Sequence, residues 1–460
     1  MAPRSASVGL VLIVALMCGR VSALQADEVV AGAVGMAGSV IEGTSFAESV
    51  DGGAACCPDP YQCGPSCWEK LMESPNLTGD WGGARTALTE SGIIYQGYLT
   101  QFYQGVASGG TEQQFKYGGK SDQFFTFMGE KLGLWKGLIV SMHAETRFGQ
   151  DSNFDAVGLA PVNANMLWPS FGQSTAISGF TVTQMLSEEW LLTAGKMNTL
   201  DLFNSLYPQG GRGVDGFMNV STFFPLSSSR PLNLSVNGLS ISKLHEGQVQ
   251  GSLAVVDTNN SSTTVGLGNL FDNGAAIIAY WRHFTEIGGL PGSHAILGEY
   301  STKSFTSIDP SDFYFIPGTG IVTGKQSGTW SLNYFGEQKV WVDACNPKRN
   351  VGLFTSWGIS DGNPNPIRWS GNVSLQGHGL IESRPADAMG IAYFYTGLSG
   401  EFRDLVSPVL NLRDVQGGEL YYNFAVTPWF NVTPDLQVIQ PATVGTDAAV
   451  VVGVRAKLTF

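Results

Sequence analysis

Charged residues are scarce in this chain, making up 14% of its 460 residues. A soluble globular protein has about a quarter of its residues charged, so this chain has too few charges to cover a soluble surface of its size. The charges present sum to a formal net charge of −13, and no lysine and arginine cluster occurs. A nucleic-acid-binding protein carries a basic patch or a high isoelectric point. The composition therefore excludes nucleic acid as a partner.

Long apolar runs are also missing beyond the first residues. No later stretch reaches 18 consecutive apolar residues, so no membrane-spanning helix is predicted. The chain begins like a secretory signal peptide, with Arg4, an apolar run over residues 8–17 and small residues at 21–23. We expect residues 1–23 to be removed on export. Without a spanning helix, an exported chain can cross a membrane only as a closed β-barrel, because no other fold satisfies its backbone hydrogen bonds there.

Cysteine is rare, and four of the six cysteines fall within one short stretch. In an exported chain such a cluster favours disulfides. A zinc site is the alternative, but no histidine lies close to the cluster. We expect residues 24–76 to form a flexible periplasmic extension and Cys345 to stand alone, and we expect neither a bound metal nor a cofactor. The disulfide candidates are Cys56, Cys57, Cys63 and Cys67.

One short helix is predicted before the strands begin. Asp80 can cap its N-terminus, and Gly92 can end it in the left-handed conformation that glycine adopts without strain. Leu88 and Ile93 would then share the face that packs on the rest of the protein. No later segment gives a convincing helix signal, so residues 77–93 are predicted to be the helical part of an otherwise all-β chain.

From residue 94 onward the sequence predicts strands of about ten residues, separated by Gly, Pro, Asn, Asp and Ser. The clearest strand covers residues 138–148, where apolar residues alternate with His143, Glu145 and Arg147. A period of two is typical of a strand with one apolar and one polar face. Further windows with this alternation, some of them weaker, cover residues 181–197, 351–359, 391–398 and 419–427.

The last strand is predicted over residues 450–460. Alternate residues from Val450 to Phe460 are apolar, and Arg455 and Lys457 lie on the opposite face. In a soluble β-sandwich the apolar face would be the core, whereas in a wide barrel it meets lipid and the charged face lines the lumen. The low charge content, and an end on an aromatic residue in register with the apolar face, favour the barrel. A final strand that pairs with the first leaves no free sheet edge.

Residues 94–460 accommodate about 16 membrane strands, at about ten residues per strand plus turns and loops. We therefore predict an all-β fold, a transmembrane antiparallel β-barrel in the outer membrane, preceded by the short helix and the extension. A secreted two-sheet protein is the alternative. Aromatic residues near strand ends are expected to form girdles at the two membrane interfaces. The girdle candidates are Trp168, Tyr207, Trp330, Trp341 and Trp429.

Residues 77–93, L-T-G-D-W-G-G-A-R-T-A-L-T-E-S-G-I, resemble the opening signature of the carbohydrate-selective porin (OprB) family. The resemblance extends to residue 460 and implies a single-chain barrel of about 16 strands, with loops folded inward as a constriction. It further implies facilitated diffusion of monosaccharides and similar polyols, without catalysis or energy coupling. Other pieces that resemble the family, in chain order, are His143-x-Glu145-x-Arg147-x-Gly149, Ala194-Gly195-Lys196, residues 383–390 and residues 419–437.

Charged side chains on the polar faces are the candidates for the solute pathway, because paired acids and guanidinium groups offer a sugar directional acceptors and donors. Binding must stay weak so that the sugar can leave. The alternative for each charge is a structural ion pair on the barrel wall, and for Arg384 and Asp387 it is a role in holding a turn. The pathway candidates are His143, Glu145, Arg147, Lys196, Arg384, Asp387, Arg455 and Lys457.

Other functions compete with a sugar porin. A barrel enzyme needs a nucleophile with a positioned base, and none of the five histidines lies in such a motif, so we expect no enzyme. A porin for another small solute or ion, or a non-transporting structural barrel, is the alternative. The expected partners are small sugars, outer-membrane lipid and the assembly machinery that reads the C-terminal strand. Both a monomer and a homotrimer fit the strand pattern.

Overall fold

A computed structural model describes residues 71–156, 161–207 and 212–460 of the chain. The predicted signal peptide and most of the predicted extension lie outside these residues, as do the disulfide candidates Cys56, Cys57, Cys63 and Cys67. Cys345 is exposed in a turn. No helix in the described part of the chain is both long enough and apolar enough to cross a membrane.

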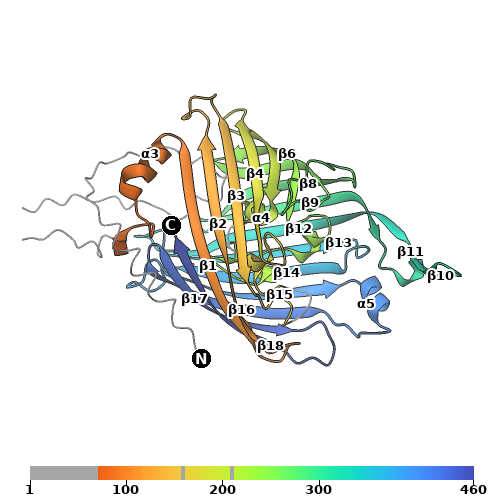
Figure 1. Cartoon of the computed structure of the whole chain (residues 1–460). Helices are drawn as coiled ribbons and strands as arrows, with labels where there is room; N and C mark the ends of the chain where they lie inside the picture. Colours follow the sequence, from red (N-terminus) through yellow and green to blue (C-terminus); the bar gives the residue numbers. More distant parts are fainter. Residues whose placement is uncertain (1–70, 157–160, 208–211) are drawn as a thin grey trace, which may run out of the picture.

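The described residues form a closed antiparallel barrel of 16 strands, which confirms the predicted fold and strand number (Figure 1). The first strand, β1 (Ile93–Ser108), pairs with β2 (Phe115–Met128) on one side and with the last strand, β18 (Ala449–Thr459), on the other. The other barrel strands are β3 (Leu138–Gly149), β4 (Ser174–Met185), β5 (Trp190–Asn198), β6 (Ser235–His245), β7 (Gln248–Asp257), β8 (Ala275–Ile287), β9 (Leu290–Thr306), β12 (Lys325–Val342), β13 (Asn350–Ser360), β14 (Ile367–His378), β15 (Ala388–Leu398), β16 (Val415–Thr427) and β17 (Phe430–Gln440).

The two ends of the barrel differ in their connections. One end has turns as short as 246–247 and 288–289, and the opposite end has the long connections 150–173 and 199–234. Outer-membrane barrels place short turns in the periplasm and long loops outside the cell, so the short-turn end is the periplasmic end. The long-loop end also carries the hairpin of β10 (Phe313–Ile316) and β11 (Gly320–Thr323) and the helix α5 (Gly400–Val406).

The two faces of the strands have opposite surroundings. On β18, the outward residues Val452 and Val454 are 39% and 44% exposed. Arg455, the residue directly after Val454, lies on the inside and is 0% exposed. On β3, His143 and Glu145 are likewise buried on the inside. The prediction that the apolar face points outward to lipid and the charged face inward is therefore confirmed.

The predicted helix is present but begins later than expected. Residues Trp81–Gly83 form a 3-10 turn and α3 covers Ala84–Glu90, because Gly82 and Gly83 adopt left-handed conformations with φ of 71° and 97°. Gly83, not the predicted Asp80, is the N-cap residue of α3, although the Asp80 carboxylate accepts hydrogen bonds from the backbone N–H and the hydroxyl of Thr86 at 2.9 Å each. Gly92, with φ of 95°, follows the helix as predicted.

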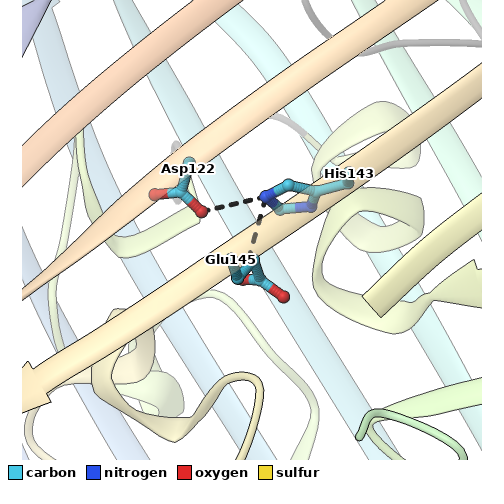
Figure 2. Close-up of side chains that lie close together, drawn as sticks. All are labelled: Asp122, His143 and Glu145. Carbon is cyan, nitrogen blue, oxygen red and sulfur yellow. Dashed lines mark hydrogen bonds and ion pairs between the residues drawn. The ribbon is translucent and has the colours of Figure 1, made fainter. Parts of the chain in front are cut away.

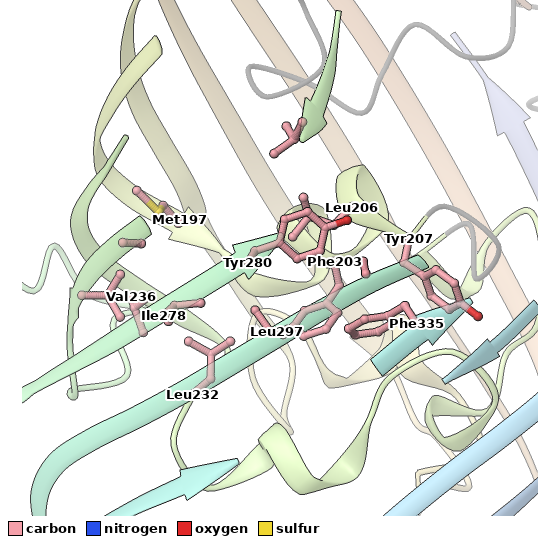
Figure 3. Close-up of a cluster of buried hydrophobic side chains, with 14 of the residues drawn as sticks. Met197, Phe203, Leu206, Tyr207, Leu232, Val236, Ile278, Tyr280, Leu297 and Phe335 are labelled. Carbon is pink, nitrogen blue, oxygen red and sulfur yellow. The ribbon is translucent and has the colours of Figure 1, made fainter. Parts of the chain in front are cut away.

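Inside the barrel lies a segment that the strand pattern did not predict. The described residues of the connection between β5 and β6, 199–207 and 212–234, fold into the lumen and pack apolar side chains against inward residues of the wall (Figure 3). They include α4 (Thr199–Leu206), whose Phe203 and Leu206 lie in one cluster with Tyr280 of β8 and Phe335 of β12. The inward face of this side of the barrel is thus apolar and dry, whereas the sequence predicted a polar inner face.

Two of the residues predicted to lie in the aromatic girdles pack inside the barrel instead, so these two predictions are wrong. Trp168 and Tyr207 are 4% and 3% exposed, and both lie in apolar clusters on the inside of the barrel. Trp330 and Trp341 are exposed on the outer wall, where a girdle needs them. An aromatic residue near a strand end can serve either place, because a ring that packs well against lipid also packs well against an apolar lumen segment.

Candidate functional site

The start of α4 is fixed by a side chain of the preceding strand. Asn198, at the end of β5, accepts hydrogen bonds through its side-chain oxygen from the backbone N–H groups of Leu200 (2.9 Å) and Asp201 (3.3 Å). This is the arrangement that begins a helix most effectively. It turns the chain from the wall into the lumen and presents Asp201 towards β2 and β3.

Three charged or polar side chains of β2 and β3 converge on the inner wall next to α4 (Figure 2). His143 Nε2 lies 2.9 Å from Asp122 Oδ1 and 3.8 Å from Glu145 Oε1. The other ring nitrogen, Nδ1, lies 2.6 Å from Asp201 Oδ2. Because both nitrogens face carboxylate oxygens, both must donate, so the ring is the imidazolium. His143 therefore joins the wall to the segment in the lumen.

Two further cations complete this cluster. The ammonium of Lys120 lies 2.5 Å from Glu145 Oε1 and 3.1 Å from Asp122 Oδ1. Arg212 Nη1 lies 3.5 Å from Asp201 Oδ1, and its guanidinium carbon is 4.4 Å from the centre of the Phe124 ring. The ring of His143 also stacks on Phe124, with the centroids 3.9 Å apart. Three positive groups therefore balance three carboxylates.

The electrostatics of Asp201 follow from these neighbours. Burial alone would raise the pKa of its carboxyl, but the charge and hydrogen bond of His143, together with Arg212, hold that pKa below its usual value. Asp201 is therefore ionised at neutral pH and keeps its bond to the wall.

The cluster also has the residue types of a metal site. Within the described residues, one ligand atom each of Asp122, His143 and Glu145 lie within 4.8 Å of one another. However, the Lys120 ammonium already contacts both carboxylates. A divalent ion would have to displace that ammonium, so the geometry fits an internal ion-pair network better than a cation site.

Strands further round the same side of the barrel bind the lumen segment through its backbone. Arg455 on β18 donates to the carbonyl oxygens of Gly213 (2.9 Å) and Gly216 (3.0 Å). Glu419 on β16 accepts from the backbone N–H groups of Met218 (2.5 Å) and Asn219 (3.0 Å). Lumen residues from 201 to 219 are thus held at several points along one continuous part of the wall, which runs in barrel order from β3 through β2, β1, β18 and β17 to β16.

The remaining predicted residues divide between the lumen and the turns. Lys457 forms an ion pair with Asp215 at 2.5 Å. Arg147 donates to the carbonyl of Ser170 at 2.6 Å and pairs with Asp151. Lys196 donates to the carbonyls of Ile177 and Thr264 at 2.7 and 2.6 Å. Each of these cations donates to acceptors of the protein itself. This favours a structural role on the barrel wall, which the sequence analysis gave as the alternative to a role in the solute pathway.

Arg384 and Asp387 do not join the lumen cluster. They lie in the turn 379–387 at the periplasmic end, where two guanidinium nitrogens of Arg384 donate to the Asp387 carboxylate at 2.8 and 2.9 Å. Tyr422 and the backbone N–H of Ala425, both on β16, donate to the same carboxylate at 2.9 Å each. The pair ties the turn to the neighbouring strand.

A cavity of about 100 Å³ lies between α4 and the inner wall of β2 to β6. Most of its lining surface is apolar, with Phe124 among the lining residues, and hydroxyl, amide and charged groups make up the rest. Among the predicted residues, the cavity brings together His143 and Lys196, but Glu145, Arg147, Arg455 and Lys457 do not line it. Its principal polar residues are His143, Thr181, Thr193, Lys196, Asp201 and Ser205.

Sequence reasoning missed several members of this site. Lys120 and Asp122 alternate with the polar residues Ser121 and Gln123 along β2, so this strand lacks the apolar face that identified β3. Asp201 and Arg212 gave no such signal, because their role depends on contacts with strands far away in the sequence.

Comparisons with known proteins agree with this architecture. The family model described as "Carbohydrate-selective porin, OprB family" matches residues 112–460. Porin B of Pseudomonas aeruginosa is 23% identical over 435 residues, covering 84% of this chain and 92% of that protein. The high-pH structure of Pseudomonas putida OprB superimposes with a TM-score of 0.69 at 21% identity, covering 85% of this chain and 100% of that chain. The low-pH structure gives a TM-score of 0.52 at 17% identity, covering 85% and 99%.

The family model begins downstream of residues 77–93, the segment that most strongly suggested the resemblance, so the remainder of the barrel carries the assignment independently. The match spans well over half of the chain. The expectation drawn from the sequence is confirmed, and the chain belongs to the carbohydrate-selective porin (OprB) family of the outer membrane.

Proposed function

We propose that the protein lets small neutral sugars and polyols, of the size of a monosaccharide, diffuse through a narrow passage between α4 and the wall of β2 to β6. Membership of a carbohydrate-selective porin family supports the class of solute. The observation that supports the route is the cavity at this place, with polar groups on the wall and on α4 facing each other across it.

The lining of the cavity suits a sugar. Thr181, Thr193 and Ser205 supply hydroxyl oxygens that accept, and Asp201 also accepts. The Lys196 ammonium has one N–H left to donate beyond the two that the carbonyls of Ile177 and Thr264 accept. Such groups replace the water that a sugar loses on entering a narrow section, and no single group binds so strongly that it would stop the flux. The Phe124 ring offers a flat apolar face.

We propose that the other predicted charged residues support the lumen segment and do not contact the solute. Glu145, Arg147, Arg455 and Lys457 are occupied by Lys120, Asp151, backbone carbonyls and Asp215. We assign them to holding the lumen segment at a fixed distance from the wall. This distance sets the size limit of the passage, in the same way that supporting groups fix other binding sites.

The family and the fold point to a channel rather than an enzyme. We propose that solutes pass unchanged and without energy coupling. The packed interior also supports a second candidate, a barrel that does not transport, because the inward charged residues at mid-height are buried. Ion conductance across a planar bilayer separates the two, since a closed barrel gives no steps.

The test is liposome swelling with the purified protein and a set of sugars of increasing size. We expect monosaccharides to enter faster than disaccharides. Thr181→Trp should fill the cavity and slow the entry of monosaccharides. Ala279→Trp places the same side chain on the exposed outer face of β8 and should leave entry unchanged. Equal rates in both variants would show that sugars do not use this cavity.

A further inference from the structure

The outward face of β8 changes in character towards the periplasmic turn 288–289. By the alternation of the strand, its outward residues in that direction are Ile277, Ala279, Trp281, His283, Thr285 and Ile287. Trp281 is 54% exposed, as expected of an interfacial aromatic side chain. His283 follows it nearer the periplasm and is also exposed, whereas Arg282 between them is buried on the inside. His283 therefore lies at the depth where lipid acyl chains give way to phosphate head groups.

A second imidazole lies beside His283. His294 on β9 is its direct partner in the strand register and is also exposed. His294 Nδ1 lies 2.6 Å from the hydroxyl of Tyr334 on β12. A hydroxyl that donates to Nδ1 leaves the ring proton on Nε2, at the far side of the ring. The two imidazoles thus offer neighbouring N–H donors to a group outside the wall.

A lysine on β6 brings a positive charge to the same part of the outer wall. Lys243 is half-buried on the outward face, between the buried residues Ser242 and Leu244. It pairs with Gly251 on β7, which pairs in turn with Trp281. The Trp281 ring covers this glycine, and the backbones of Lys243 and Trp281 are about 10 Å apart across the two strand spacings. Within the described residues the Lys243 ammonium has no acceptor.

Two carboxylates lie at a level nearer the periplasm than these donors. Glu246 is in the turn after β6, three residues beyond Lys243, and Glu286 is three residues beyond His283 on β8. Both are exposed, and neither has an ion-pair partner in the part of the chain that the structure describes. Donors near the membrane are therefore followed by negative groups nearer the periplasm.

We propose that Lys243, Trp281, His283 and His294, with the carboxylates beyond them, form a binding site for the head group of one phospholipid in the inner leaflet. The phosphate accepts from the ammonium and the imidazoles, and the ammonium of a zwitterionic head group lies at the carboxylates. This order of charges favours phosphatidylethanolamine over phosphatidylglycerol, which has a phosphate but no cation for the carboxylates. The proposal rests on the barrel fold and its orientation, not on the sugar pathway.

The test measures which lipid stays bound to the full-length protein. The protein in detergent is mixed with phosphatidylethanolamine or phosphatidylglycerol, and the retained lipid is measured by native mass spectrometry. We expect more phosphatidylethanolamine to be retained. Lys243→Gln should lower its retention about fivefold, the effect of one cation near a phosphate surface. Lys136→Gln removes an exposed lysine from the periplasmic turn 129–137 on another part of the barrel and should leave retention unchanged.

The carboxylates and the acyl chains are tested separately. Glu246→Gln with Glu286→Gln should remove the preference between the two lipids. Soluble phosphoethanolamine, the same head group without acyl chains, should not displace the lipid, and displacement would overturn the assignment to a lipid. Folding of each variant is checked by its heat-dependent mobility on a gel. Equal retention of the two lipids by the natural protein overturns the proposal. So does phosphatidylethanolamine retention that is equal in Lys243→Gln and Lys136→Gln.

Discussion

His143 on β3 and Asp201 on α4 lie 2.6 Å apart, nitrogen to oxygen, and join the barrel wall to the segment that fills part of its lumen. The second ring nitrogen of His143 is held by Asp122 on the neighbouring strand. The position of α4, and with it the width of the adjacent cavity, therefore depends on a charged ring held between two carboxylates. Further round the same side of the barrel, Arg455 and Glu419 hold the backbone of the same segment.

Removing the imidazole should loosen α4. His143→Ala leaves the buried carboxylates of Asp122 and Asp201 without a shared donor, which costs about 3 kcal/mol of folding free energy and frees the segment to move. We expect a higher and noisier single-channel conductance in planar bilayers. His245→Ala, which removes an exposed imidazole at the end of β6, should leave the conductance unchanged. Identical traces for the two variants would contradict the role of His143.

Replacing the guanidinium of Arg455 by an ammonium should weaken the other anchor. Lysine cannot reproduce two parallel bonds to Gly213 and Gly216, so Arg455→Lys should lower the free energy of unfolding by about 2 kcal/mol. Urea unfolding in lipid vesicles measures this. Arg368→Lys, at an exposed arginine that donates to the Ser360 carbonyl, should change it by less than about 0.5 kcal/mol. A loss no larger for Arg455→Lys than for Arg368→Lys would argue against the anchor.

The Asp387 carboxylate, which ties the turn 379–387 to β16, should make the free energy of unfolding depend on pH. Burial alone would raise the pKa of this carboxyl, but the hydrogen bonds from Arg384, Ala425 and Tyr422 hold that pKa below its usual value. A carboxylate with a depressed pKa stabilises the folded state above its unfolded-state pKa of about 4, and the contribution is lost as the pH falls through the folded-state value.

Asp387→Asn should therefore cost about 2 kcal/mol at neutral pH, and the difference from the natural protein should shrink as the pH falls below about 4. Urea midpoints at a series of pH values measure it. The control is Asp404→Asn on the exposed side of α5, which should cost little at any pH. A difference between Asp387→Asn and the natural protein that stayed constant down to low pH would remove the charge from the explanation.

The segment before β1 should stabilise the closing seam of the barrel. Leu77 donates its backbone N–H to the Thr459 carbonyl of β18 at 2.8 Å. Arg85 reaches the Tyr95 carbonyl of β1 at 3.5 Å and lies 4.5 Å from the centre of the Trp81 ring. Arg85→Ala should cost about 1 kcal/mol, seen as a lower temperature of heat-dependent gel mobility, and Arg85→Lys should recover part of it. Full stability of the alanine variant would contradict this role.

The sequence predicted the barrel wall well because a period of two is a local property. Val450 to Phe460 and His143 to Arg147 each show their two faces within a few residues, and the structure confirms both. The 16 strands followed from the length and the repeated pattern.

The contents of the lumen could not be predicted in this way. The backbone N–H of Met218 donates to the carboxylate of Glu419, which lies 201 residues further along the chain. No local sequence pattern indicates such a contact. Tyr280 and Phe335 are large apolar residues on the inner face of the wall. Their position there can be explained only once α4 is known to pack against them. Consequently the sequence identified some charged residues of the inner wall, such as His143 and Glu145, but not their partners Asp201 and Arg212 on the lumen segment.

The entry of monosaccharides into liposomes most directly tests the central claim, that sugars pass between α4 and the wall. With the natural protein, monosaccharides should enter faster than disaccharides. The entry rate of monosaccharides should fall in Thr181→Trp and remain unchanged in Ala279→Trp. Monosaccharide entry that is as fast in Thr181→Trp as in the natural protein, or no entry at all with the natural protein, would contradict the account.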